Sequence, residues 1–186
     1  MPASRTYLES CIVRYCAPTL AKLKPAGLFS CALTDAPTLA AQIDSLNKLL
    51  NHQDVHLRVL EATAERALIY VYRAEPLAEH LAPAAVQAFL AECGYRPGSV
   101  EETLRQLQAK LAAGLPHEIG LFLGYPLADV IGFINNKGQN YLCCGCWKVY
   151  ADAAQAQATF GELRRCRGAY LQQFSRGKSL PELVRC

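Results

Sequence analysis

Two runs rich in β-branched and aromatic residues lie only three residues apart, at 55–62 (VHLRVLEA) and 66–73 (RALIYVYR). Two such runs joined by a short polar connection, here Thr-Ala-Glu, are typical of a β-hairpin. Stretches with apolar residues at helical spacing lie on both sides of it. A chain that combines an antiparallel strand pair with several helices is predicted to have an α+β fold.

The remaining strands and helices follow from the same patterns. Further strands are predicted at 26–31 (AGLFSC), 117–123 (HEIGLFL) and 146–150 (CWKVY). Helices are predicted over 5–15, 18–24, 38–51, 83–93, 99–113 and 126–138, with a long last helix capped by Asp152. We therefore expect one domain over 1–177, with a mixed sheet of four or five strands covered by helices, and a loose tail over 178–186.

Composition argues against two classes of partner. The net charge of the 186 residues is only +3, and Lys and Arg are scattered, so no nucleic-acid-binding surface is predicted. No run approaches the roughly 18 apolar residues of a membrane helix. The charges at Arg5, Glu9 and Arg14 interrupt what would be the apolar part of a signal peptide, so we expect a cytoplasmic protein with no membrane partner.

The chain contains nine cysteines, an odd number. In a reducing compartment they are expected to be free thiols, metal ligands or catalytic groups rather than disulfides. Buried cysteine is also a common small apolar residue, so most of the nine are expected to fill the core.

Cys16 is the first candidate for chemistry, because it precedes Pro18 at the predicted start of a helix. The partial positive charge of a helix N-terminus favours thiolate over thiol, and Lys22 and Lys24 add positive potential. Cys16 could then be a nucleophile or a soft metal ligand. The alternative is that it packs between the helix and the sheet.

His117 is the second candidate, and it lies beside Glu118 at the start of a predicted strand. Adjacent residues of a strand point to opposite faces, so only one of the two is expected in a pocket. Histidine suits proton transfer and metal binding, although a single His after Pro is often structural. Tyr125 follows in the Gly-Tyr-Pro turn, and Asp129 argues against an anion site at the next helix N-terminus.

The segment 135–150 (NNKGQNYLCCGCWKVY) is the third candidate. Lys137 and Asn140 lie in its polar loop, and an amide-rich loop beside aromatic residues such as Trp147 resembles a small-molecule pocket. Its cysteines lack the C-x₂-C spacing of zinc sites, so a core role for them is the alternative.

Three blocks of the sequence resemble a domain-of-unknown-function family of anaerobic, gut-associated bacteria, over nearly the whole chain. The blocks are CAPTLAKLKPAGLFSC, PHEIGLFLGYPLADVIGFINNKGQNY and CGCWKVYAD. The resemblance implies an iron, haem or redox setting, and with it a flavodoxin-type redox partner, but it brings no catalytic residues. Cys146 departs from the family pattern, where an aromatic residue is expected, and this weakens a ligand role for it.

Three functional hypotheses follow. The first is a cofactor- or metal-handling protein, with Cys16 and His117 as reactive or ligating pair for iron, haem iron or zinc, surrounded by Lys24, Tyr125, Lys137, Asn140 and Trp147. The second is a cysteine-dependent hydrolase or transferase, with Cys16 as nucleophile and His117 as base. The third is a non-catalytic interaction scaffold. Both chemical hypotheses require Cys16 and His117 to lie close together.

Overall fold

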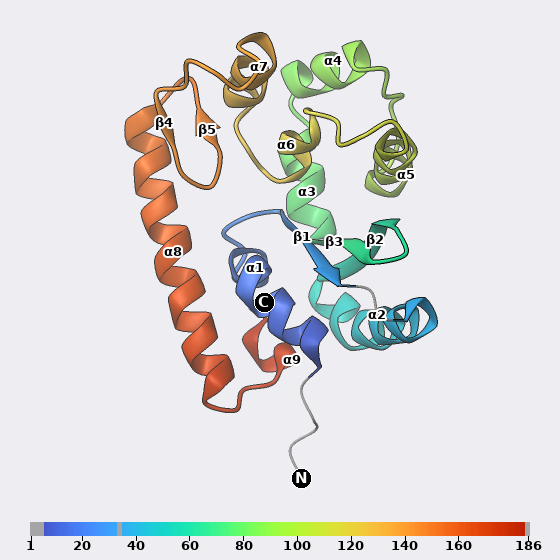
Figure 1. Ribbon diagram of the computed structural model, residues 1–186. Helices are drawn as coiled ribbons and strands as arrows, with labels where there is room; N and C mark the ends of the chain where they lie inside the picture. Colours follow the sequence, from blue (N-terminus) through green and yellow to red (C-terminus); the bar gives the residue numbers. More distant parts are fainter. Residues whose placement is uncertain (1–5, 33–34, 185–186) are drawn as a thin grey trace. The chain divides into compact units, whose positions relative to one another are not determined.

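The computed structural model describes residues 6–32 and 35–184, and these divide into two compact units (Figure 1). The first unit contains residues up to 76 together with those from 166 onward, and the second contains 77–165. The expected single domain is therefore not confirmed. The fold is α+β, as predicted. Arg5, the first residue of the predicted first helix, and residues 185–186, the last two of the predicted tail, lie outside the described residues.

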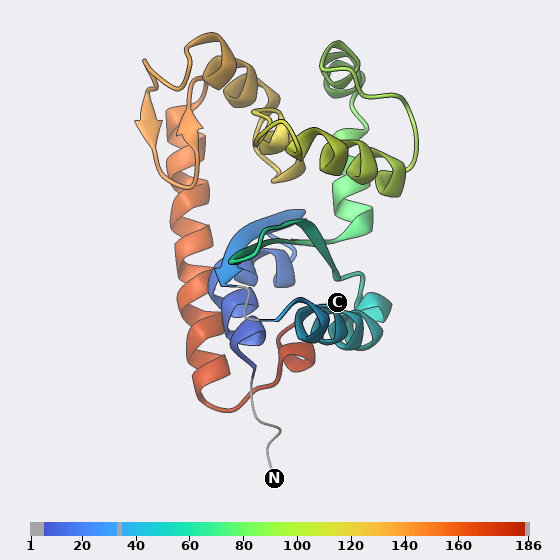
Figure 2. The same cartoon turned by 45° about the vertical axis from the view of Figure 1, so that its right-hand side comes forward.

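The first unit is built around a three-stranded antiparallel sheet with the order β1-β3-β2. The predicted hairpin is confirmed, since β2 and β3 pair with Val59 opposite Ile69. Figure 2 shows α1 and α2 on one face of this sheet. In chain order the unit contains α1 (Tyr7–Leu20), β1 (Ala26–Ala32), α2 (Ala36–Leu50), the 3-10 turn η1 (Asn51–Gln53), β2 (His56–Ala62), β3 (Arg66–Tyr72), the start of α3 (Ala74–Leu81), the end of α8 (Ala153–Ser175) and α9 (Leu180–Leu183).

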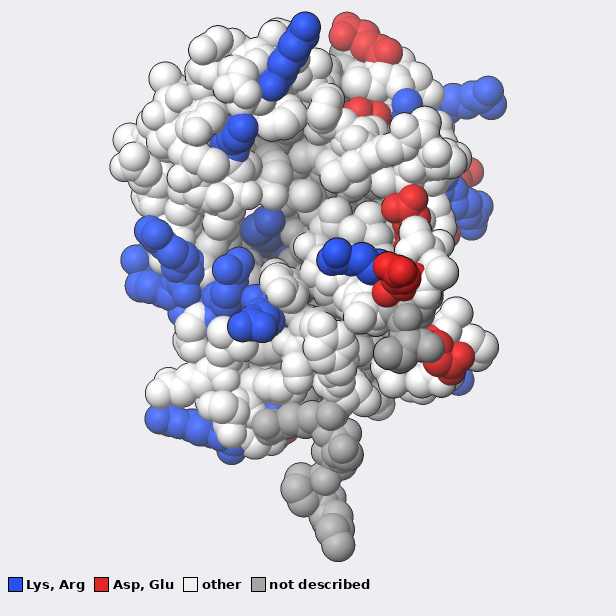
Figure 3. Space-filling view, viewed as in Figure 1, with Lys and Arg blue, Asp and Glu red and all other residues white. Residues whose placement is uncertain are grey.

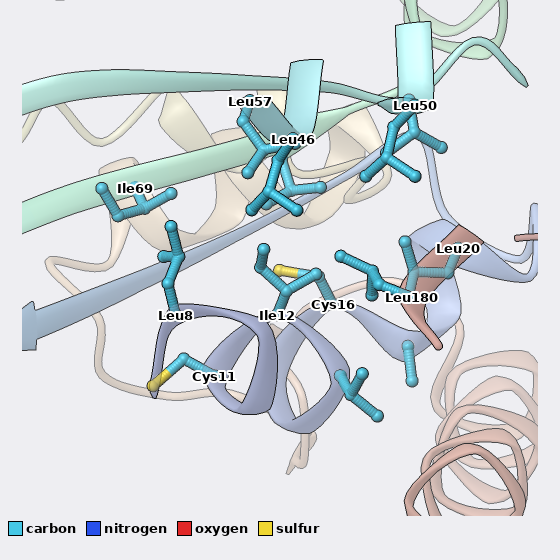
Figure 4. Close-up of a cluster of buried hydrophobic side chains, with 14 of the residues drawn as sticks. Leu8, Cys11, Ile12, Cys16, Leu20, Leu46, Leu50, Leu57, Ile69 and Leu180 are labelled. Carbon is cyan, nitrogen blue, oxygen red and sulfur yellow. The ribbon is translucent and has the colours of Figure 1, made fainter. Parts of the chain in front are cut away.

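The core of the first unit lies between the sheet and α1 and α2 (Figure 4). Leu8, Ile12, Cys16 and Leu20 recur every four residues along α1 and are all buried there. Such i, i+4 spacing places them on one face of the helix, and α9 contributes Leu180 to the same cluster. Burial of this continuous stripe explains why α1 extends so far.

The predicted break before Pro18 is wrong, because Pro18 lies inside α1 and the helix begins after a Thr6–Glu9 capping box. A proline in the last turn removes only one backbone hydrogen bond, and the apolar stripe outweighs that loss. The buried Arg73 guanidinium then closes the helix end, where its Nε donates to the Thr19 carbonyl over 2.8 Å and its Nη2 to the Leu20 carbonyl over 2.8 Å.

The second unit is mainly helical and carries a small hairpin of β4 and β5. Ser99 and Glu102 form the predicted capping box of α5, and Gly138 has a φ of 72° just after α7. The unit contains the rest of α3, α4 (Ala84–Glu92), α5 (Val100–Leu111), α6 (Ile119–Phe122), α7 (Leu127–Asn135), β4 (Cys143–Cys144), β5 (Lys148–Val149) and the start of α8, which Asp152 caps as predicted.

In the second unit the structure differs from two of the strands that the sequence predicted. Residues 117–123 are not a strand but a turn followed by α6, and the predicted strand 146–150 is reduced to β5. A short apolar run has no periodicity that distinguishes a buried helical turn from a buried strand. Ile119 and Phe122 are buried in either case. The sheets accordingly have three and two strands, rather than four or five in one sheet.

Residues 179–184 differ from the loose tail that was expected over 178–186. Ser179 and Glu182 form a capping box, and Leu180 and Leu183 are buried in the core of the first unit. Two leucines three residues apart on one helical turn were too short a pattern to be recognised in the sequence.

Candidate functional site

A cavity of about 350 Å³ opens in the second unit. Three segments form it: residues 115–120, the turn into α7 with the inner face of that helix, and the β4–β5 hairpin. Its volume lies near the lower end of the range for small-molecule sites, roughly 300–1,000 Å³. The lining residues are Leu115, Pro116, His117, Ile119, Gly120, Tyr125, Asp129, Val130, Phe133, Cys144, Gly145, Cys146, Trp147 and Lys148.

Gly120 allows the helical walls of this cavity to come together. A Cβ built on Gly120 would lie 2.9 Å from Val130 Cγ2 and 3.1 Å from Tyr125 Cδ2. Any larger side chain would therefore push α6 away from α7 and from the turn between them. The apolar wall of the pocket depends on this glycine.

Asp129 fixes the hairpin to α7. Its carboxylate is buried, with 4% of the residue exposed. Oδ2 accepts from Trp147 Nε1 over 2.7 Å, and Oδ1 accepts from the backbone N–H of Tyr150 over 2.7 Å and of Ala151 over 3.1 Å. Three donors compensate the charge, which is the condition for burying a carboxylate without large cost. Asp129 thus has a structural role that the sequence did not reveal.

Trp147 is held on both sides. Its indole stacks on Tyr125 with ring centroids 4.9 Å apart and meets the Phe160 ring edge-on at 4.6 Å. The Tyr125 hydroxyl donates to the Cys146 carbonyl over 3.2 Å. Burial, together with nearby Cys146, raises the pKa of Tyr125 to about 12, so this hydroxyl remains a neutral donor at physiological pH. The aromatic end of the pocket is therefore rigid.

Lys148 and His117 both line the pocket, and both lie near the Phe133 ring. Lys148 Nζ donates to the Gly138 carbonyl over 2.7 Å and lies 5.0 Å from the centre of the Tyr141 ring and 5.9 Å from that of Phe133. The His117 side chain is exposed and contacts Phe133 edge-on at 5.2 Å. Over residues 6–32 and 35–184, no carboxylate lies within ion-pair distance of Lys148.

Only one of His117 and Glu118 lines the pocket, as expected, although the two residues lie in a turn and not on a strand. Glu118 is buried, where it accepts from the Tyr95 hydroxyl over 3.3 Å and lies 3.7 Å from Lys110 Nζ. Burial and the adjacent Glu118 raise the pKa of Tyr95 well above its usual value. This cluster connects α5, which contains Lys110, to Glu118 at the N-cap of α6.

The pocket lining includes one imidazole, that of His117, and two thiols, those of Cys144 and Cys146. Cys144 is exposed and Cys146 is half-buried, and both are free thiols. Among the residues that the structure describes, no three His, Cys, Asp or Glu side chains are grouped so that they could hold a metal ion. The metal-ligand pair that the sequence suggested, Cys16 and His117, is not tested by this observation, because the two residues belong to different units.

Of the predicted site residues, His117, Tyr125 and Trp147 line one pocket. Lys137 and Asn140 lie in the connection between α7 and β4, both exposed and both at positive φ, and neither lines the pocket. Lys148 and Phe133 also line the pocket, and neither was recognised as a site residue in the sequence. The signal for Lys148 was its position beside Trp147 in CGCWKVY.

Cys16 and Lys24 belong to the first unit, so the predicted proximity of Cys16 to His117 stays a prediction. The predicted reason for Cys16 reactivity is nevertheless wrong, because Cys16 lies in the interior of α1 and not at its N-cap. Its side chain is fully buried, and burial raises the pKa of the thiol to about 12 despite nearby Lys24 and Arg167.

A family model described as "Protein of unknown function (DUF3793)" matches residues 12–184, which include all three blocks and every pocket residue. The chain belongs to this family. No curated protein and no solved structure matches this DUF3793 chain. Among its described helices, none has the length and apolar character required to cross a bilayer.

Proposed function

We propose that this DUF3793 protein handles a small molecule or cofactor, and that the pocket in its second unit is the binding site. The observation that carries the proposal is that two of the three sequence blocks converge on one ligand-sized cavity. Its lining is mostly apolar and aromatic with a few polar groups, which is the usual character of small-molecule sites. A cytoplasmic location and a redox setting remain part of the proposal as expectations from the sequence.

The rigidity of the pocket supports this proposal. The Asp129 hydrogen bonds and the Tyr125–Trp147–Phe160 ring contacts hold the hairpin in place through contacts within the chain. A preformed pocket loses little conformational entropy on binding. The proposal does not include Cys16, because a buried, protonated thiol lacks the accessibility that both chemical hypotheses required.

The single tryptophan provides the test. Trp147 is the only Trp in the chain, so the amide NMR spectrum contains one indole N–H signal, and that group lies at the pocket. Screening a library of one- and two-ring compounds should identify ligands that shift this signal. If no compound in the library shifts the Trp147 indole signal at millimolar concentration, the proposal is contradicted.

Two variants of the hairpin control this screen. Cys144→Tyr places a large side chain at an exposed position that lines the cavity, so it should abolish the shifts. Leu142→Tyr adds a similar ring to the same hairpin at a position that is 60% exposed and does not line the cavity, so it should retain them. Equal binding by both variants would place the ligand elsewhere.

An interaction module is the second candidate function. Leu115, Tyr141 and Leu142 are large apolar side chains of the second unit with 57%, 43% and 60% of their surface exposed. Figure 3 shows few charged side chains over β4, β5 and α7 in that view, whereas basic side chains gather over the middle of α8. If these three residues form an interface between copies, sedimentation should show association that Leu142→Ser weakens. A monomer at all concentrations would count against self-association.

A further inference from the structure

The charges that line the pocket are unequally compensated. Asp129 accepts three hydrogen bonds from N–H groups of the hairpin and the residues after it, so its carboxylate is occupied. Lys148 donates one hydrogen bond to a neutral carbonyl, and an ammonium has two further donors. In the described part of the chain no carboxylate pairs with it. The pocket lining therefore includes one positive charge, that of Lys148, which no carboxylate compensates.

The position of Lys148 is fixed by its surroundings. Lys148 pairs with Cys144 across the hairpin, so both side chains lie on the same face, and both line the cavity. The Gly138 carbonyl and the Tyr141 and Phe133 rings hold its ammonium group. A cation fixed in this way loses less entropy on pairing than a free surface lysine does.

The remaining lining restricts the body of the ligand. Tyr125, Phe133 and Trp147 supply aromatic rings, and the His117 ring lies beside Phe133. Ring faces and edges of this kind favour a flat aromatic partner. A cavity of about 350 Å³ accommodates one or two fused rings.

We propose that the ligand of this pocket is a small aromatic carboxylate, with its ring between the aromatic walls and its anionic group at Lys148. This inference rests on the proposed function, since it assigns a chemical class to the same site. A single lysine suits a singly charged anion, because a phosphate dianion would require further donors. A charge-assisted hydrogen bond at this site should be worth roughly tenfold in affinity.

Three probes with the same ring system but different charges distinguish the contribution of the charge to affinity from that of the ring. They are 2-naphthoate, 2-naphthamide and naphthalene-2-carboxamidine, which carry a negative, a zero and a positive charge on the same bicyclic body. Titration of each, followed by the Trp147 indole signal, should rank naphthoate about tenfold above the amide and the amidine last. This ranking uses the wild-type protein and depends on no substitution.

Lysine variants test the assignment of the charge. Lys148→Met should remove the preference of naphthoate over the amide, and Lys148→Arg should retain it. Lys137→Met is the matched control, since it removes an exposed charge in the same unit that does not line the pocket, and it should keep the wild-type ranking.

The outcomes distinguish the inference from the proposed function. If the amide binds as tightly as naphthoate, or the amidine binds best, the anionic ligand is wrong while the pocket still binds small molecules. If the Lys148→Met variant still prefers naphthoate over the amide, the assignment of the anionic group to Lys148 is also wrong. If none of the three probes binds, and the ring library does not bind either, the proposed function fails together with the inference.

Discussion

The Trp147 indole donates its N–H to the buried Asp129 carboxylate over 2.7 Å, although 18 residues separate the two in sequence. This hydrogen bond joins the hairpin to α7, and the two N–H groups of Tyr150 and Ala151 on the other carboxylate oxygen strengthen the connection. The pocket lies between the elements that this connection holds together. Its shape therefore depends on Asp129, a residue with no direct role in the proposed recognition.

Asp129→Ala should lower the free energy of unfolding by about 2–4 kcal/mol, because three N–H donors lose a charged acceptor. Urea denaturation followed by Trp147 fluorescence measures this loss. Glu162→Ala on α8 is the control, since it removes an exposed carboxylate with no hydrogen bond or ion pair in the described structure, and it should change stability by less than about 0.5 kcal/mol. Equal effects of the two substitutions would contradict the assigned role of Asp129.

The accessibility of thiols gives a second prediction. With iodoacetamide at pH 7, Cys144 should react early, because it is exposed, and Cys16 should stay unmodified until the protein is unfolded. Mass mapping after a short exposure identifies the modified residues, and a sample in denaturant controls for complete labelling. Modification of native Cys16 at the rate of Cys144 would restore it as a candidate nucleophile.

Alkaline pH should destabilise the first unit through Cys16. The thiol has a pKa of about 12 in the folded chain against 9.0 for a free cysteine, so above pH 9 unfolding releases a proton. The stabilising effect is complete below pH 9 and is lost as pH rises toward 12. From pH 8 to pH 11 the loss should reach about 2–3 kcal/mol.

Comparison with Cys16→Ala isolates this effect from other titrating groups. The unfolding free energy of the wild type minus that of the variant should fall by about 2–3 kcal/mol between pH 8 and pH 11. A difference that stays constant with pH would show that the thiol of Cys16 titrates normally in the folded protein.

The close approach of α1 to β1 leads to a fourth prediction. A Cβ on Gly27 would lie 2.7 Å from Cys16 Sγ and 3.3 Å from its Cβ. Gly27→Ala should therefore destabilise the first unit by about 1–3 kcal/mol through overpacking. Cys16→Ala in the same chain should recover part of this loss, because it removes the nearer atom.

A double-mutant cycle from denaturation curves measures that coupling. We expect a coupling of roughly 0.5–3 kcal/mol, in the sense that the double variant is more stable than additivity predicts. Additive effects would mean that the helix and strand do not contact one another through these two residues.

Local pattern was sufficient for several elements that their own periodicity or their own caps stabilise. The hairpin of 55–62 and 66–73, the α2 stripe of Ile43, Leu46 and Leu50, and the Ser99–Glu102 capping box are all confirmed. Family membership was also readable, because long blocks of sequence carry it. In each case the information lies within continuous stretches of the chain.

Tertiary structure decided the rest. The extension of α1 past Pro18 depends on burial against the sheet, which also determines that Cys16 is a core residue rather than a helix cap. The helical turn of 119–122 and the pocket depend on the approach of Val130 and Tyr125 to Gly120. Neither contact is visible in local periodicity, because burial energy depends on which segments meet, and segments far apart in sequence meet only in the folded chain.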